Sequence, residues 1–296
     1  MRVVVTGGTG FIGEPLVRRL LARGDDVAVV TRNPSKVRAG TPLPWERIDD
    51  AASADVVINL AGENVGGGRW TEERKRRIVS SRVDATTALV EALNRRPDPR
   101  RTLINASAIG IYGLRGDEPL DETAPPGEGF LAEVVKRWEE LARRAEGAAR
   151  VVILRLGVVL APGGGALGKM LLPFRLGLGG PMGSGRQWMS WVDREDVLRM
   201  MEWAIDHRSA QGVYNAASPN PVRNSDFARA LGRALHRPAF MPAPAFALRL
   251  ALGREMADEM LLGGQRVVPA RAAAEGFTFA RPELDASLKR AVSSAT

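Results

Sequence analysis

The chain opens on a β-branched run that leads directly into a glycine-rich segment, Thr6-Gly-Gly-Thr-Gly-Phe-Ile-Gly13. A helical pattern follows from Phe11 to about Arg23, and a second strand-like run covers Asp26–Thr31. A strand, a tight turn and a helix N-terminus in this order suit a pyrophosphate, because unpaired amides and the positive end of the helix dipole converge at the turn. A plain loop is the alternative, but the flanking strands and helix favour a dinucleotide site.

The glycines of this segment have separate predicted roles. Gly7 would allow the sharp turn, and Gly10 would let the backbone approach the anion. Gly13 would let the helix pack closely on the strand. The predicted cofactor-binding residues of the segment are Gly7, Thr9, Gly10, Phe11, Ile12 and Gly13.

Composition excludes several classes of site. The 296 residues are 45% hydrophobic and 26% charged, as in an ordinary globular protein. The absence of cysteine excludes disulfides and thiolate chemistry, and two histidines are too few for a histidine metal cluster. No apolar run reaches membrane-spanning length, and the N-terminus has the pattern of a core strand, not of a signal peptide. We therefore expect a cytoplasmic protein with no metal site and no membrane contact.

The net charge of +8 raises the question of nucleic-acid binding. Only five of the 42 basic residues are lysine, and the arginines are spread along the whole chain. The densest basic run, Arg74-Lys-Arg-Arg77, lies on a predicted helix without interleaved aromatic residues. This distribution predicts no nucleic-acid partner. The positive field should instead help to attract an anionic small molecule.

Strand-like and helical patterns alternate through the first half of the chain. Near-continuous Val, Ile and Leu strands separated by helices indicate a parallel sheet that is covered on both faces. Right-handed crossovers then give an α/β doubly wound fold with ligands at the carboxyl ends of the strands. The further predicted strands are Trp45–Ile48, Asp55–Leu60, Arg101–Ala106, Arg150–Leu156 and Gly212–Ala216, and the helices are 71–94 and 130–146.

The character of the chain changes after Leu160, where glycine-rich loops begin. We predict a dinucleotide-binding domain over residues 1–160, completed by about 190–216. Residues 161–189 and 217–296 would form a smaller substrate or lid module. The elements predicted after Leu160, besides the strand Gly212–Ala216, are a strand at Trp188–Val192 and helices at 166–176, 194–206, 225–235 and 245–252. The last few residues are predicted to be disordered.

Motifs along the whole chain resemble the extended short-chain dehydrogenase/reductase superfamily, with its Gly-x-x-Gly-x-x-Gly fingerprint and Rossmann-type sheet. The chain is most similar to the branch called epimerase family proteins, sometimes labelled sugar-nucleotide epimerases or cell-division inhibitors. This resemblance implies nicotinamide dinucleotide binding and an appended C-terminal helical module; homodimers are common in the superfamily. The motifs are Asn59-Leu-Ala-Gly-Glu-Asn64, Arg69-Trp-Thr71 with Arg82, Ser107-Ala-Ile-Gly-Ile-Tyr-Gly113, Arg155-Leu-Gly-Val-Val-Leu160, Lys169-Met-Leu-Leu-Pro-Phe-Arg-Leu-Gly-Leu-Gly-Gly180, Gly183-Ser-Gly-Arg-Gln-Trp-Met-Ser-Trp191 and Gly264-Gln-Arg-Val-Val-Pro269.

The choice of cofactor depends on the end of the second strand. An acidic residue there would bind both ribose hydroxyls and repel a 2′-phosphate, but this chain has Thr31-Arg-Asn33. The Arg32 guanidinium can stack on adenine and pair with a phosphate, so the sequence favours NADP(H) over NAD(H). The alternative is that Arg32 is simply an exposed arginine in an arginine-rich chain.

Three further groups of residues are assigned to the cofactor through the resemblance. The small residues of Leu60-Ala61-Gly62 would lie along the adenosine, or would simply pack at the strand end. Arg82 would contact the phosphates, with a solvated helix arginine as the alternative. Val158 and Val159 would border the nicotinamide, or else belong to the core.

The catalytic tyrosine and lysine of the superfamily are missing. In one register their positions hold Leu131 and Val135, and in the other Phe130 and Val134. Two other polar groups follow the fifth strand and are the catalytic candidates. They are Ser107, whose place Ala108 takes in the alternative alignment, and Tyr112.

Glycine-rich turns beside basic residues and tryptophans suggest a site for a small anionic or planar substrate. Tryptophans in the core and arginines in solvent are the alternative for each residue taken singly. The predicted substrate-binding residues are Glu63, Lys169, Arg186, Trp188 and Trp191.

These features predict an NADPH-dependent oxidoreductase that acts on a small carbonyl substrate through an atypical site. Hydride transfer requires mainly a positioned nicotinamide, and Ser107, Tyr112 or ordered water would supply the proton. The competing hypothesis is an NADPH-binding sensor or regulator without turnover, which the missing tyrosine and lysine favour. Sugar-nucleotide epimerisation is less well supported, because the base on which it depends is absent.

Overall fold

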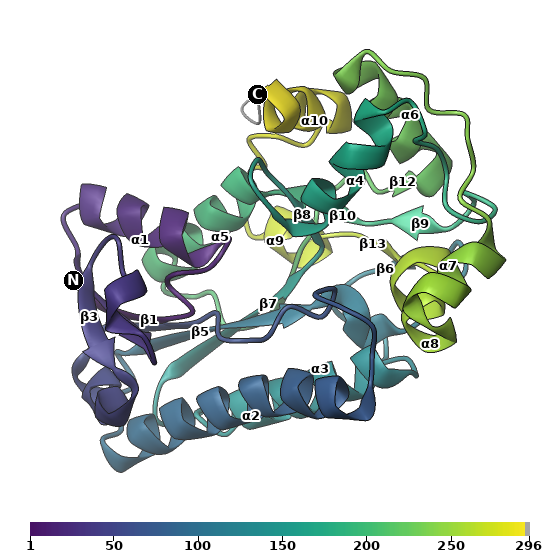
Figure 1. The fold of residues 1–296 in the computed structure, drawn as a ribbon. Helices are drawn as coiled ribbons and strands as arrows, with labels where there is room; N and C mark the ends of the chain where they lie inside the picture. Colours follow the sequence, from purple (N-terminus) through teal and green to yellow (C-terminus); the bar gives the residue numbers. More distant parts are fainter. Residues whose placement is uncertain (294–296) are drawn as a thin grey trace.

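The structure, a computed structural model, describes residues 1–293, so the disorder predicted for the last few residues falls partly on residues 294–296, outside this range. Its centre is a seven-stranded sheet in which every neighbouring pair of strands is parallel (Figure 1). In spatial order the strands are β3 (Thr41–Pro44), β2 (Asp26–Thr31), β1 (Arg2–Thr6), β4 (Val56–Asn59), β5 (Thr102–Ala108), β7 (Arg150–Leu156) and β11 (Gly212–Ala216). The order reverses on either side of β1, which confirms the predicted doubly wound fold.

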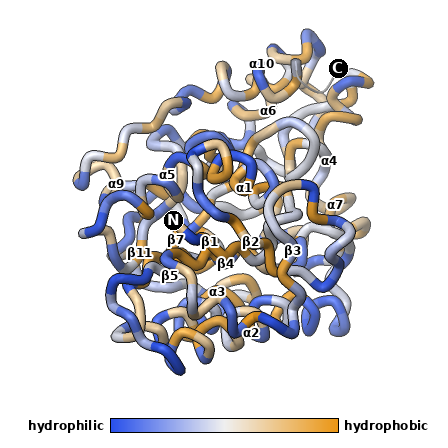
Figure 2. Tube along the Cα trace, turned by 90° about the vertical axis from the view of Figure 1, so that its left-hand side faces the viewer, coloured by the Kyte–Doolittle hydropathy of each residue, from blue (hydrophilic) through white to orange (hydrophobic). Residues whose placement is uncertain are grey.

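Helices cover both faces of this sheet. Helices α1 (Gly13–Ala22) and α5 (Arg194–Asp206) lie on one face, and α2 (Glu72–Arg95) and α3 (Phe130–Arg143) lie on the other (Figure 1). Successive residues of a strand therefore enter different cores: Val3 and Val5 pack toward α1, whereas Val4 packs toward α2. Figure 2 shows the resulting concentration of hydrophobic residues along the central strands β1, β2 and β4.

The strand predicted at Trp45–Ile48 is wrong by several residues. The edge strand β3 ends at Pro44, and residues Trp45–Ser53 form a 3₁₀ segment. Prolines are tolerated in β3 because it lies at the edge of the sheet, where ladder hydrogen bonds are needed on one side only. Ile48 and Ala51, three residues apart, enter the core beside α2, which is helical and not strand spacing.

A second core lies beyond the carboxyl ends of the strands. Helices α4 (Gly165–Arg175), α6 (Asn224–Leu235) and α10 (Leu284–Ser293) pack around it. Short strands complete the module: β8 (Val158–Leu160) pairs with β10 (Trp191–Asp193), and β9 (Trp188–Met189) pairs with β12 (Val222–Arg223).

The strand predicted at Trp188–Val192 is therefore two strands in two different sheets. Ser190 separates them because it bonds to two other segments. Its hydroxyl donates to the Gln265 carbonyl at 2.7 Å and accepts from the Val267 amide at 2.9 Å, while its own carbonyl accepts from the Val158 amide.

The remaining segments connect the module to the sheet. Strand β13 (Arg266–Val267) pairs with β6 (Pro119–Leu120), the strand that follows the 3₁₀ turn Ile109–Tyr112. Within residues 1–293 no helix combines the length and the apolar character needed to cross a bilayer. The other elements are α7 (Ala245–Leu252), α8 (Arg254–Ala257), a π-helical turn (Asp258–Leu262), α9 (Ala270–Ala274) and a 3₁₀ turn (Pro34–Lys36).

Two adjacent leucines on α1 provide a matched test of this packing. Leu20 is fully buried between α1 and the sheet, whereas Leu21 is 38% exposed. We expect Leu20→Ala to lower the free energy of unfolding by about 2–5 kcal/mol, because it removes buried methyl groups and leaves a cavity. Leu21→Ala should cost less than about 1 kcal/mol. Equilibrium denaturant unfolding measures both, and equal losses would contradict the packing described.

Candidate functional site

The glycine-rich turn after β1 has the geometry that its sequence predicts. Gly7 has a φ of +68°, and a Cβ atom there would lie 2.5 Å from the Leu60 carbonyl oxygen. A Cβ atom at Gly13 would lie 2.2 Å from the Gly7 carbonyl oxygen. Only glycine fits either position, so the predicted roles of Gly7 in the turn and of Gly13 in helix packing are confirmed.

The backbone amides at the end of this turn are available to a ligand. The Gly10 amide donates to the Gly7 carbonyl at 3.0 Å, and the Glu14 amide donates to the Gly10 carbonyl at 3.0 Å. Within residues 1–293 the amides of Phe11 and Ile12 have no acceptor. Because α1 begins at Gly13, these two amides lie at the positive end of its dipole, which is the arrangement that binds a phosphate.

A cavity of about 450 Å³ opens beside this turn. The Arg194 guanidinium lies 4.8 Å from the centre of the Phe11 ring and donates to the Phe11 carbonyl. The turn around Gly164 packs against the same ring. Arg194 and this turn were missed by the sequence analysis, since nothing in their local pattern relates them to Phe11. Residues around the cavity include Thr9, Gly10, Phe11, Arg18, Gly164 and Arg194.

A buried polar network joins the carboxyl ends of β1 and β4 to the middle of β5. The Thr6 hydroxyl donates to Asn59 Oδ1 at 2.7 Å, and Asn59 Nδ2 donates to Asn105 Oδ1 at 2.6 Å and to the Thr86 hydroxyl at 2.9 Å. Each of these residues is almost fully buried. The network holds these three strands together at the level where β1 and β4 end. Asparagine at the end of an apolar strand was the available sequence signal.

Arg82 lies against the end of β4. A Cβ atom at Gly62 would lie 3.0 Å from Arg82 Cζ, so the guanidinium packs closely against this glycine. The guanidinium donates to the Ile78 carbonyl at 3.0 Å and lies 5.1 Å from the centre of the Trp138 ring. Within the described chain it forms no ion pair, and burial lowers the pKa of Arg82 to about 10, partly opposed by the charge of Glu63. The group stays protonated at neutral pH and lacks a direct counter-ion.

The residues predicted to select the cofactor lie where β2 ends. The Thr31 hydroxyl accepts from the Asn33 amide at 3.0 Å and so shapes the turn. Arg32 is exposed beside it, and no carboxylate follows the strand. Val158 and Val159 are half-buried in β8.

The predicted catalytic pair is wrong in its geometry. Tyr112 is fully buried; its hydroxyl accepts from Arg155 Nη1 at 2.9 Å and lies 2.8 Å from Asn215 Oδ1. Ser107 is 2% exposed and donates its hydroxyl hydrogen to Glu139 Oε1 at 2.6 Å. Both hydroxyls belong to one buried network, so neither is presented to a substrate as a proton donor.

A buried ion pair is the centre of this network. Arg155 Nε and Nη2 donate to the two carboxylate oxygens of Glu139, each at 2.8 Å. Burial alone lowers the pKa of Arg155, but the hydrogen bonds and charge of Glu139 outweigh it and raise the pKa above its usual value. Burial raises the pKa of Tyr112, against the opposing effect of Arg155. The sequence analysis did not assign this pair to the site.

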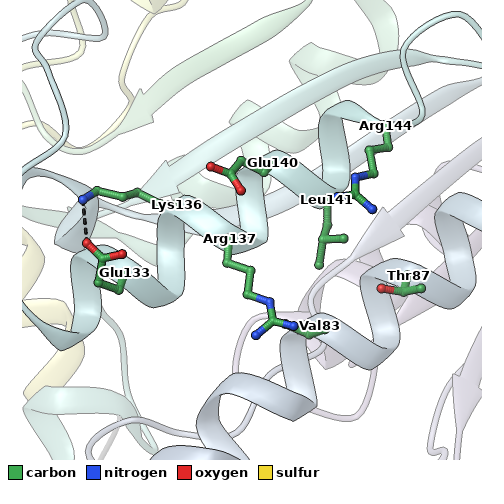
Figure 3. A pocket seen from close by; sticks show the side chains of 8 residues that line it. All are labelled: Val83, Thr87, Glu133, Lys136, Arg137, Glu140, Leu141 and Arg144. Atoms are coloured by element: carbon green, nitrogen blue, oxygen red, sulfur yellow. Dashed lines mark hydrogen bonds and ion pairs between the residues drawn. The ribbon is translucent and has the colours of Figure 1, made fainter.

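In the first of the two registers, the positions of the superfamily's tyrosine and lysine hold Leu131 and Val135, and both side chains lie among apolar neighbours. Leu131 lies at the start of α3, and its Cβ lies 3.3 Å from where a Cβ atom of Gly110 would be. Val135 is buried in the small core around Tyr112. Lys136 pairs with Glu133 on the outer side of the helix, so it does not replace the missing lysine (Figure 3).

The predicted role of Trp191 in substrate binding is wrong. Its side chain is fully buried in the second core beside Phe227, and its indole donates to the Asn220 carbonyl at 2.9 Å. Trp188 is half-buried, and the guanidinium groups of Arg223 and Arg266 lie 4.0 and 4.8 Å from its ring centre.

The other predicted substrate residues are distributed around the loop that follows β4. The Glu63 carboxylate pairs with Arg74 at 3.0 Å. Lys169 of α4 donates to the Gly66 carbonyl and so ties this loop to the second module. Arg186 is exposed beside Trp188. Glu63 thus lies in the loop that Lys169 contacts, whereas Arg186 lies on the segment that contains Trp188.

A second cavity, of about 500 Å³, lies between the outer sides of α2 and α3 (Figure 3). It contains none of the predicted site residues, and it lies on the helices, away from the turn at Gly7. We therefore do not assign it to the dinucleotide site. Its lining residues are Val83, Thr87, Glu133, Lys136, Arg137, Glu140, Leu141 and Arg144.

Two family models match the chain. Residues 3–217 match the NAD dependent epimerase/dehydratase family, and residues 243–291 match a domain of unknown function, DUF1731. The human epimerase family protein SDR39U1 is 40% identical over 297 residues, which cover 99% of this chain and 100% of the human protein. The Bacillus subtilis epimerase family protein YfhF is 36% identical over 301 residues, 99% of this chain and 98% of that protein.

Solved structures give the same assignment of the fold. The crystal structure of human SDR39U1 (isoform 2) with NADPH matches with a TM-score of 0.92 and 38% identity, over 99% of both chains. The Thermus thermophilus UDP-glucose 4-epimerase in complex with NAD matches with a TM-score of 0.77 and 23% identity, over 99% of this chain and 98% of that one. The second likeness concerns the fold alone.

The two tyrosines of the chain allow a direct test of the site chemistry. Burial raises the pKa of Tyr112, and burial with the hydrogen bond to Glu275 raises the pKa of Tyr214 to about 12. At a pH of about 10, where the unfolded chain is half-ionised, we expect the native protein to have a smaller tyrosinate absorbance than the unfolded chain. Because both native pKa values are raised, stability is full below a pH of about 10 and falls as the pH rises further.

Spectrophotometric titration of the native protein, of Tyr112→Phe and of Tyr214→Phe assigns each step. A native tyrosine that ionises near neutral pH and disappears in Tyr112→Phe would restore the catalytic role that the buried network excludes.

Proposed function

Because the chain belongs to the NAD dependent epimerase/dehydratase family, we propose that it binds NADP(H) and transfers hydride to a small carbonyl substrate. The unpaired amides of Phe11 and Ile12, at the N-terminus of α1, carry this proposal. Two adjacent amide donors and a helix dipole suit the pyrophosphate of a dinucleotide. The NADPH-bound human relative, with 38% identity over 99% of this chain, supports the same assignment.

Several residues would hold the cofactor along the carboxyl edge of the sheet. Arg82, which has no counter-ion in the described chain, would neutralise a phosphate. Arg32 would contact the 2′-phosphate, since no acidic residue at the end of β2 repels it. Gly62 and Ala61 would leave room for the adenosine, and Val158 would border the nicotinamide.

When bound, the reduced cofactor supplies a hydride, that is, a proton with two electrons. The chain contributes orientation: the turn at Gly7 fixes the phosphates, and the network around Asn59 fixes the strand ends beneath the rings. Epimerisation of a sugar nucleotide is not supported, because it requires a base that removes and returns an alcohol proton. The positions of that base and its lysine hold Leu131 and Val135 in one register and Phe130 and Val134 in the other.

A cofactor-binding sensor without turnover is the second candidate function. It is favoured by the commitment of the Ser107 hydrogen to Glu139 and by the burial of Tyr112. Incubation of the purified protein with NADPH and a panel of aldehydes, ketones and quinones separates the two functions. Oxidation of NADPH above the protein-free rate supports the enzyme. Tight binding without oxidation across the panel supports the sensor.

Arg82 should contribute strongly to cofactor affinity. We expect Arg82→Met to weaken NADPH binding by about tenfold or more, because a charge-assisted hydrogen bond to a phosphate contributes about 1.5–3 kcal/mol. The matched control is Arg95→Met on the same helix, since Arg95 is exposed and pairs with Asp49. Isothermal titration calorimetry measures both. Equal affinities for Arg82→Met and the wild type would remove Arg82 from the site.

Arg32 should discriminate between the two pyridine nucleotides. We expect Arg32→Ala to weaken NADPH binding by about tenfold and to leave NADH binding nearly unchanged, because only NADPH carries the 2′-phosphate. Arg38→Ala, which alters an exposed arginine a few residues further along, is the control. Calorimetry with both nucleotides gives the ratio. A loss of affinity that is equal for NADPH and NADH would contradict this assignment.

A further inference from the structure

The hydrogen-bond donors around the carboxyl end of β5 are already engaged. The Ser107 hydroxyl donates to Glu139, and both oxygens of Glu139 also accept from Arg155. Tyr112 is fully buried against Arg155. These groups hold one another in place, and the hydroxyl hydrogens of Ser107 and Tyr112 are directed to protein acceptors.

The start of α3 is engaged in the same way. Glu259 of the π-helical turn accepts from the Phe130 amide at 2.8 Å and from the Leu131 amide at 2.9 Å. Gly129 allows this approach, because a Cβ atom there would lie 2.8 Å from Glu259 Oε1. The helix N-terminus therefore has its own carboxylate and cannot serve as an oxyanion hole for a substrate.

The ammonium groups of Lys75 and Lys169 also have protein partners. Lys75 forms an ion pair with Glu255, and this hydrogen bond raises the pKa of Lys75 despite partial burial. Lys169 donates to the Gly66 carbonyl. Lys75 lies 5.2 Å from the centre of the Phe130 ring, where its positive charge favours a developing anion.

The open surface at the same place is aromatic and apolar. Trp70 and Phe130 are in edge-to-face contact, with ring centres 4.9 Å apart, and Leu131 follows directly. All three are only half-buried, so each keeps area for a ligand. The Trp70 indole donates to the Val65 carbonyl at 2.9 Å, which fixes the ring. This patch of Trp70, Phe130 and Leu131 suits a flat apolar molecule.

Building on the proposed function, we propose that the substrate is a planar conjugated carbonyl compound of the quinone type. Hydride addition to a simple ketone forms a localised alkoxide, which needs a proton donor at once. Transfer to a quinone breaks the cofactor C–H bond, forms an O–H bond at one quinone oxygen as its C=O π bond opens, and shifts the electron pair through the ring to the distant oxygen. The products are the oxidised cofactor and a delocalised hydroquinone anion, which takes its proton from water after release. A site whose two hydroxyl groups are already engaged therefore favours the second reaction.

A matched pair of bicyclic substrates tests this inference. We expect the protein to oxidise NADPH with 1,4-naphthoquinone at least about a hundredfold faster than with 1-tetralone, after subtraction of the protein-free rate, because the missing general acid contributes about 10²–10⁴-fold. Comparable rates would overturn the inference but keep the proposed oxidoreductase. Turnover of neither compound would overturn both, while calorimetry would still report whether NADPH binds.

Binding without turnover gives an independent readout. We expect 1,4-naphthoquinone to bind the protein saturated with NADP⁺, and Phe130→Ala to weaken this binding by about tenfold through loss of aromatic contact. Phe246→Ala is the control, since Phe246 is 74% exposed on α7. Calorimetric titration measures both. Equal affinity in Phe130→Ala and the wild type would overturn the placement of the substrate on this patch.

Discussion

The contact between the backbone of Gly13 and the carbonyl oxygen of Gly7 determines where the first helix begins. A Cβ atom at Gly13 would lie 2.2 Å from that oxygen, so a larger residue would push α1 away from the sheet. With α1 in place, the amides of Phe11 and Ile12 lie beyond the end of β1 with no partner in the described chain. The proposed position of the cofactor phosphates follows from this packing.

The buried pair of Glu139 and Arg155 has a different consequence. Removing two charges from water is costly, and this pair is stabilised by two direct hydrogen bonds between its partners and by Ser107 and Tyr112. Because the Ser107 and Tyr112 hydroxyls take part in these bonds, neither is free to donate a proton to a substrate. The network around Glu139 and Arg155 therefore has a structural role at the place where other members of the superfamily carry out acid–base catalysis. This is consistent with the proposed substrate, which needs no acid.

The C-terminal segment is joined to the sheet domain by side-chain to backbone hydrogen bonds. Glu259 caps α3, and Gln187 Nε2 donates to the Leu261 carbonyl at 2.7 Å. These bonds hold the π-helical turn next to the start of α3 and next to Gln187. The module therefore fixes the start of α3, where the aromatic patch lies, as well as packing its own core.

The sequence by itself determined the sheet, the phosphate-binding turn and the missing tyrosine and lysine, because these depend on local patterns: apolar runs, glycine spacing and residue identity. Only the tertiary structure decided whether a polar or aromatic side chain faces a ligand or the interior. Trp191 entered the core and Tyr112 a buried network, although Trp188, near Trp191 in sequence, stayed half-exposed. Glu139 and Arg155 are 16 residues apart and come from different elements, so their pairing is set by how α3 packs on β7. Contacts of this kind depend on distances between elements, which a single chain's local pattern does not encode.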